Sequence, residues 1–297
     1  MGDRGVCRRG PAAGRRRLVT GTAARAGVVA GVDESEAALV AVRWAAEEAT
    51  RRGCVLQLFH AGLSDTAGLT GPERSREAPR LLERAHRWIR RAAQVAEEAA
   101  PGVRTEYLVR LGLAADLLVE LSADADLIVL GSHGLGGLHG AAIGSVALRV
   151  AAGAHCPVVV VRGRAKPGGP VLTGVDRDDG ALEFAFEAAL DRGVPVVAVH
   201  AWHEGLLDAP EIVEAEAQCE EEELHRRVEA LSGKYPEVRA RSCAVRDRSP
   251  ARALLRFDGA QLVVIGSRGR GPITGALFGS TGNRLLAESA CPVAVVH

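Results

Sequence analysis

Residues 131–161 read GSHGLGGLHGAAIGSVALRVAAGAHCPVVVV, and residues 266–296 read GSRGRGPITGALFGSTGNRLLAESACPVAVV. Aligned without a gap, the two segments are identical at 15 of 31 positions. The identical residues include several glycines, a Gly-Ser pair and a Cys-Pro pair, so they are not merely scattered apolar positions. This self-similarity predicts two copies of one domain in tandem.

Each copy follows a strand-like apolar run, at 126–130 or 261–265, and passes into an amphipathic helix that begins near the Gly-Ser pair. Glycines let a backbone approach a phosphate closely. The start of a helix offers free N–H groups and the positive end of its dipole. The pattern therefore predicts an anion cradle. A tight strand-to-helix connection that needs glycine only for its turn is the alternative, and the repeated G-x2-G-x9-G-S spacing disfavours it.

This spacing, followed by a Cys-Pro-Val strand, resembles the nucleotide-binding signature of the universal stress protein family over roughly residues 27–297. The resemblance implies ATP as the ligand, with or without Mg²⁺, and a strand order of 3-2-1-4-5 in each domain. The expected organisation is a disordered Arg-rich tail (1–26), a first domain (27–163), a linker (164–170) and a second domain (171–297).

Strand-like and helix-like segments alternate along the chain, which predicts an α/β fold of two doubly wound domains. Each domain is expected to hold a five-stranded parallel sheet with helices on both faces. Strands are predicted at 27–33, 55–60, 105–109, 126–130, 157–162, 171–176, 194–200, 238–245, 261–265 and 292–297. Helices are predicted at 36–52, 80–100, 114–123, 180–192, 210–233 and 249–257 and after each cradle, and a loop is predicted at 64–79.

Composition narrows the classes of function. The chain has 297 residues and a formal net charge of zero, so no overall basic field favours nucleic acid or a membrane surface. No apolar run reaches the length of a membrane span. The six cysteines are spread singly, without the C-x2-C pairs of structural zinc sites, and fit a reducing cytoplasm.

Two common nucleotide-binding classes are disfavoured. The G-x4-G-K-[ST] motif of Walker-type NTPases is missing. The glycine fingerprint of dinucleotide-binding dehydrogenases belongs after the first strand, where both halves of this chain have Gly-Val-Asp instead.

Asp33 and Asp176 end the predicted first strands, at the sheet edge where open α/β sheets bind ligands. Helix capping by Asp33 with Ser35 is an alternative role that is compatible with ligand contact. In the resembled family, this aspartate lies beside the ribose and adenine. The candidate nucleotide-binding residues are Gly31, Asp33, Gly131, Ser132, His133, Gly134, Gly144 and Ser145 in the first domain, and Gly174, Asp176, Gly266, Ser267, Arg268, Gly269, Gly279, Ser280 and Thr281 in the second.

Three functions remain open at this point. The leading hypothesis is a nucleotide-binding stress or regulatory protein. A slow ATPase or adenylyl-transfer enzyme of related fold is the second, although no catalytic residue can be named. An interaction module that has lost its nucleotide is the third.

Two further expectations concern the pairing of the domains and their sites. The apolar last strands should pack on each other as a pseudo-dimer within the chain, with a homodimer left open. The second site should bind more tightly, because Arg268 and Thr281 stand where the first copy has His133 and Val146.

Overall fold

The computed structural model describes residues 26–62, 72–134, 143–176, 178–203, 210–267 and 279–297. Apart from residue 26, the predicted tail lies outside these ranges, and so do Arg268 and Gly269. The first half comprises β1 (Ala26–Gly31), α1 (Glu36–Arg51), β2 (Leu56–Gly62), α2 (Pro72–Ala99), β3 (Thr105–Leu111), α3 (Ala114–Leu121), β4 (Ala125–Gly131), α4 (Ser145–Gly153) and β5 (Val158–Val161). The second half comprises β6 (Val171–Gly174), α5 (Gly180–Leu190), β7 (Val196–Trp202), α6 (Pro210–Lys234), β8 (Ala240–Arg246), α7 (Pro250–Leu255), β9 (Leu262–Gly266), α8 (Ser280–Glu288) and β10 (Val293–Val296).

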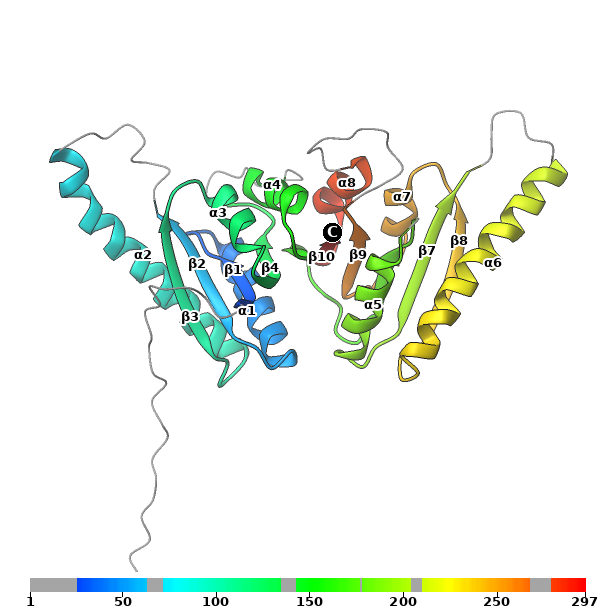
Figure 1. The fold of residues 1–297 in the computed structure, drawn as a ribbon, viewed down its shortest axis with the longest axis horizontal. Helices are drawn as coiled ribbons and strands as arrows, with labels where there is room; N and C mark the ends of the chain where they lie inside the picture. The colour runs from blue at the N-terminus through cyan, green and yellow to red at the C-terminus, as the bar shows by residue number, and fades with distance from the viewer. Residues whose placement is uncertain (1–25, 63–71, 135–142, 177, 204–209, 268–278) are drawn as a thin grey trace, which may run out of the picture.

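All ten strands form one sheet, in the order β3-β2-β1-β4-β5-β10-β9-β6-β7-β8. Each half is parallel and follows the predicted order 3-2-1-4-5. The halves join where β5 and β10 pair antiparallel, with Val159 opposite Ala294. The expectation that the last strands of the two domains pack on each other is therefore confirmed, and Figure 1 shows the two halves facing each other across this joint.

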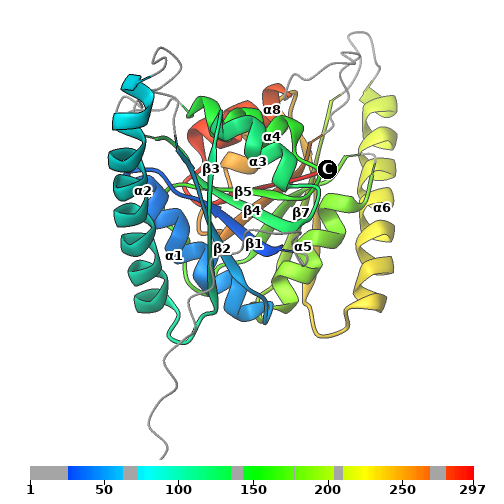
Figure 2. The same cartoon turned by 60° about the vertical axis from the view of Figure 1, so that its left-hand side comes forward.

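Two helical layers cover the sheet, because its strands are apolar on both faces. One buried cluster joins strand residues to α1, α2, α5 and α6, and the other joins them to α3, α4, α7 and α8. Both clusters run through both halves of the chain, and Figure 2 shows the layers from a second direction. The sheet is thus the middle layer of a continuous three-layer sandwich. Among the described helices, none is long and apolar enough to span a bilayer.

The prediction of a loop over 64–79 was wrong for its second part, because α2 begins at Pro72 rather than near Arg80. Proline is tolerated in the first turn of a helix, where its missing N–H has no intrahelical partner anyway. The residues that follow are mostly Glu, Arg and Ala, which favour helix. Pro79 suggested a boundary, but the helix passes through it. The other described boundaries differ from the predictions by a few residues at most.

A buried carboxylate fixes the corner between β8 and α7. Asp247 has a side chain only 1% exposed and accepts hydrogen bonds from Arg252 Nε at 2.8 Å and from the Ser249 amide at 2.8 Å. Ser249 in turn caps α7 by accepting from the Arg252 amide. The hydrogen bonds from Arg252 and Ser249 lower the pKa of Asp247 to about 2.

This corner should make stability depend on acid pH. The folded pKa of Asp247 lies below its ordinary value of 3.8, so its contribution is complete above that value and is lost as pH falls towards 2. The Asp247→Asn variant should therefore be less stable than the parent at pH 7, and the difference in unfolding free energy should shrink between pH 4 and 2. Urea denaturation of both proteins at several pH values measures this, and a difference independent of pH would contradict it.

Candidate nucleotide-binding site

The site of the first domain begins at the carboxyl end of β1. There Asp33 Oδ1 accepts hydrogen bonds from the backbone N–H of Ser35 at 2.9 Å and from its hydroxyl. The Ser35 hydroxyl accepts in turn from the Ala38 amide at 3.1 Å and so caps α1. Ser35 thus serves both as the predicted helix cap and as the group that holds the Asp33 carboxylate in place.

The glycines of the first cradle allow several close approaches. A β-carbon at Gly131 would lie 2.7 Å from the carbonyl carbon of Ala37, so glycine lets the end of β4 touch the first turn of α1. A β-carbon at Gly134 would lie 2.4 Å from Asp33 Oδ2. One at Gly144 would lie 3.2 Å from the Cα of His133. Gly131 therefore has a packing role, whereas Gly134 brings the cradle backbone against the Asp33 carboxylate.

The helix that follows starts without a side-chain cap. Gly144 is the N-cap of α4, and the first intrahelical bond runs from Leu148 N to Gly144 O at 3.0 Å. The amides of residues 145–147 consequently have no partner within the helix. The first turn contains no acidic side chain, and Ser145 is exposed. This helix end is suited to an anion.

A cavity of about 550 Å³ lies between these groups. Seven of the predicted residues line it, namely Gly31, Asp33, Gly131, His133, Gly134, Gly144 and Ser145. Ser132 is not among the lining residues, and its hydroxyl lies 3.0 Å from His133 Nδ1. The rest of the lining was not included among the candidate residues and is mostly apolar: Val32, Ala38, Phe59, His60, Ala61, Ala114, Leu118, Leu130, Ile143, Val146 and Ala147.

Sequence alone could not single out these apolar residues, because Phe59, Leu118 and Leu130 are ordinary core residues in its pattern. His60 lies near the end of β2, and its Nδ1 lies 2.8 Å from the Val32 carbonyl. Because a carbonyl only accepts, Nδ1 is the donor in this contact. His200 makes the same contact with Val175 at 2.8 Å.

The second domain repeats the arrangement as far as it is described. Gly174 and Gly266 end the parallel strands β6 and β9, and Asp176 follows β6. The amide of Ser267 donates to the carbonyl of Val296. Gly279 is the N-cap of α8, again without a side-chain cap, and Ser280 and Thr281 open that helix.

In each domain, an arginine from the long outer helix binds the loop that follows the domain's first strand. The sequence did not indicate these contacts. In the second domain, Arg227 of α6 donates to the carbonyls of Asp176 and Asp178 and pairs with the Asp179 carboxylate at 2.6 Å. In the first domain, Arg84 of α2 pairs with Glu34.

The first cavity has few ionisable lining residues. Its ionisable lining residues are Asp33, His60 and His133. Burial raises the pKa of the Cys156 thiol to about 12, which keeps it protonated. Within the described residues, no group of three or more His, Cys, Asp or Glu side chains is placed to hold a metal ion.

Comparisons with known proteins agree with this arrangement. The model of the universal stress protein family matches residues 27–162 and 170–297. A universal stress protein of Mycobacterium tuberculosis H37Rv is 36% identical over 295 residues, covering 91% of this chain and 96% of that protein. A second one from the same strain is 33% identical over 303 residues, covering 91% and 95%. The chain therefore belongs to the universal stress protein family, as a member with two tandem domains.

Solved structures show the same fold. A universal stress protein from Archaeoglobus fulgidus DSM 4304 superposes with a TM-score of 0.70 at 19% identity, covering 91% of this chain and 97% of that one. A universal stress protein from Pseudomonas aeruginosa UCBPP-PA14 has a TM-score of 0.55 at 18% identity, covering 92% and 93%.

The packing role of Gly131 can be separated from ligand binding. Gly131→Ala should lower the free energy of unfolding by about 2 kcal/mol, because the new carbon meets backbone atoms that cannot move aside cheaply. Gly153→Ala is the matched control, since its β-carbon would find Val119 Cγ2 at an ordinary 3.7 Å. Urea denaturation without nucleotide measures both variants. Equal stabilities of Gly131→Ala and the parent would show that the close approach to α1 is dispensable.

Proposed function

We propose that this protein binds an adenine nucleotide, ATP foremost, in the first cavity and at the equivalent place in the second domain. Its role would be regulatory, in the response to stress, with nucleotide binding as the signal. The observation that carries the proposal is the placement of the uncapped α4 N-terminus, Gly134 and Asp33 around one cavity of about 550 Å³. That volume falls within the range of small-molecule sites.

The phosphates would occupy the polar end of the cavity. Amides at the start of α4 and the Ser145 hydroxyl would donate to phosphate oxygens, and the glycine at 134 leaves room for close approach. A Mg²⁺ ion, where one accompanies ATP, would be held chiefly by phosphate oxygens and water, as this ion commonly is. The same groups at Gly279, Ser280 and Thr281 would serve the second domain.

The nucleoside would occupy the apolar end. Phe59, Leu118 and Ile143 offer the hydrophobic surface that a purine base requires. Asp33 also lines the cavity and would accept hydrogen bonds from ribose hydroxyls. Its carboxylate is already oriented by Ser35, so binding would not have to order it.

Binding without appreciable turnover fits the lining best. Asp33 is the only carboxylate among the lining residues of the described cavity, and no lysine lies beside it. A hydrolase or transferase would need a second group to activate its nucleophile. We therefore assign no catalytic residue, and hydrolysis, if measured, should be slow.

The setting that we propose is the cytoplasm, with neither nucleic acid nor a membrane as partner. Net charge is zero over the chain, and the five cysteines among the described residues are free thiols. Tighter binding at the second site also stays a prediction, since Arg268 falls outside the described ranges.

The first test compares ligands. Isothermal titration calorimetry should give binding of ATP but not of NAD, because the cradle follows the fourth strand of each half and the first strand lacks a dinucleotide fingerprint. Binding of NAD in preference to ATP would overturn the proposal.

The second test uses Gly134→Ala, whose β-carbon would collide with Asp33 Oδ2. The ATP affinity of the first-domain site should fall roughly tenfold, an effect comparable to the loss of one charge-assisted hydrogen bond. The other site should be unchanged, because it lies in the second domain. Gly153→Ala again serves as the control and should bind like the parent. Unaltered affinity in Gly134→Ala, with an intact circular dichroism spectrum, would mean that this glycine serves only the turn.

A further inference from the structure

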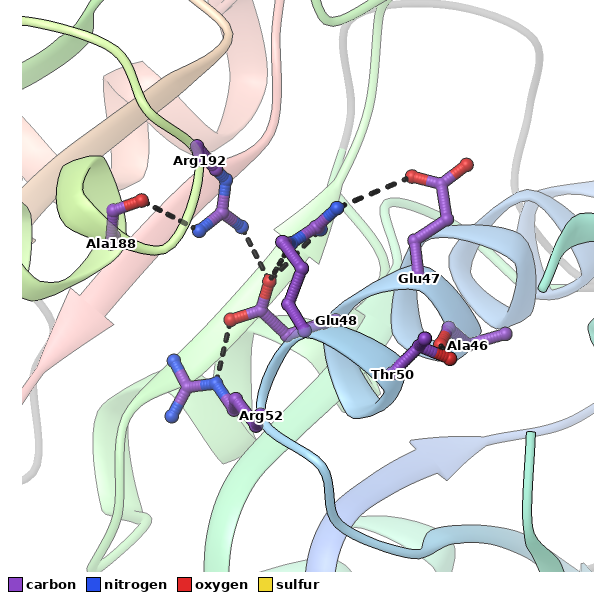
Figure 3. Close-up of polar contacts among 8 residues, drawn as sticks. Ala46, Glu47, Glu48, Thr50, Arg52, Ala188 and Arg192 are labelled. Carbon is purple, nitrogen blue, oxygen red and sulfur yellow. Dashed lines mark hydrogen bonds and ion pairs between the residues drawn. The ribbon is translucent and has the colours of Figure 1, made fainter. Parts of the chain in front are cut away.

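A buried cluster of charged side chains lies at the joint between the two domains, outside the cavity described above. Glu48 of α1 has a side chain 1% exposed, and Arg192, which follows α5 in the other domain, has one 6% exposed. Arg192 Nη2 lies 2.5 Å from Glu48 Oε2, and its Nη1 donates to the Ala188 carbonyl at 3.0 Å. Figure 3 shows the guanidinium of Arg192 entering the cluster from the second domain.

Two more arginines reach the same carboxylate from α1 and its C-cap. Arg52 Nε donates to Oε1 at 2.6 Å (Figure 3). Arg51 Nη2 donates to Oε2 at 3.0 Å. Burial raises the pKa of Glu48, but the charges of Arg192, Arg52 and Arg51 outweigh it, and the pKa lies below its ordinary value. One carboxylate is thus the shared counter-ion of three guanidinium groups.

The two arginines that follow the helices also stack across the joint in a reciprocal way. Arg192 lies over the ring of Trp44, 5.5 Å from its centroid, and Arg52 lies over the ring of Phe184 at 5.8 Å. Each aromatic residue precedes the arginine of its own domain by eight positions. The joint is therefore nearly symmetric in its cation–π contacts.

The carboxylate breaks this symmetry. Glu48 lies four residues before Arg52, and the residue four before Arg192 is Ala188, which is 1% exposed. If two second domains paired like with like, two Arg192 side chains would be buried against Ala188 without a counter-ion. A buried guanidinium that lacks a partner carries a large desolvation cost. If two chains paired first domain with first domain and second domain with second domain, the second-domain pair would bury Arg192 against Ala188 in this way.

We propose that Glu48 determines which domains pair: among the described residues it supplies the buried counter-ion of Arg192, so the second domain pairs with the first rather than with a second copy of itself. The β5–β10 ladder supplies most of the contact, and valine strands of this kind would pair with either domain. The charge cluster makes the pairing selective, because Glu48 lies on the first domain and the second domain has Ala188 at the equivalent position.

Hydrogen exchange on the full-length chain tests this, with the amides of residues 158, 160, 293 and 295, which face the partner strand across the joint, as reporters and those of the β2–β3 ladder as an internal reference. Glu48→Ala should exchange about a hundredfold faster at the joint, the scale expected when one partner of a buried ion pair is removed. Glu47→Ala is the matched control and should behave like the parent, because Glu47 is 51% exposed and lies 3.9 Å from Arg51.

The decisive variant moves the acid to the other side of the joint. In Glu48→Ala/Ala188→Glu, the new carboxylate stands four residues before Arg192, as Glu48 stands before Arg52, and exchange at the joint should return to within about threefold of the parent. Should Glu48→Ala fail to fold, Glu48→Gln with and without Ala188→Glu supports the same comparison. Unchanged exchange in the single variant, equal acceleration in Glu47→Ala, or no recovery in the double variant would each overturn the proposal.

Discussion

The site depends on a contact between backbones, the approach of β4 to the first turn of α1 at Gly131. Any side chain there would meet the Ala37 carbonyl group at under 3 Å. Because β4 comes so close to α1, the turn before α1 and the loop after β4 lie side by side. Asp33 and Ser35 belong to the first segment and Gly134 to the second, and the contact between the Asp33 carboxylate and Gly134 follows from their shared position.

The topology places this local contact at the proposed ligand site. In an open α/β sheet, the strand order reverses between the first and fourth strands, and helices leave to opposite faces there. Here α1 covers one face and α4 the other, so their N-termini flank the crevice above β1 and β4. The N-terminus of α1 is capped by Ser35, whereas that of α4 has no side-chain cap. The uncapped end is the one that can accept an external anion.

The repeat let the sequence predict much of this arrangement. The strand order was implied by the family resemblance, and the repeated glycine motif together with that resemblance pointed to seven of the cavity residues. The Ser35 cap could be predicted because serine favours the N-cap position of a helix. The apolar wall could not, since Phe59 and Leu118 differ from core residues only in facing a cavity. The start of α2 was missed because Pro72 and Pro79 suggested a loop, although one opens the helix and the other lies within it.

Glu48 shows a different limit of sequence reasoning. On α1 alone it forms an ordinary i,i+4 pair with Arg52, of the kind found on solvated helix faces. In the folded chain its side chain is buried, and Arg192 and Phe184 of the second domain lie against this end of the helix. Pairwise spacing within one helix carries no information about a partner 144 residues away.

Mass spectrometry of the protein purified without added nucleotide tests the central claim most directly. The account predicts that denaturation releases an adenine nucleotide, or that the emptied chain takes up to two ATP molecules under native conditions, one for each cradle. A chain that releases no nucleotide and gains no mass at saturating ATP would contradict it.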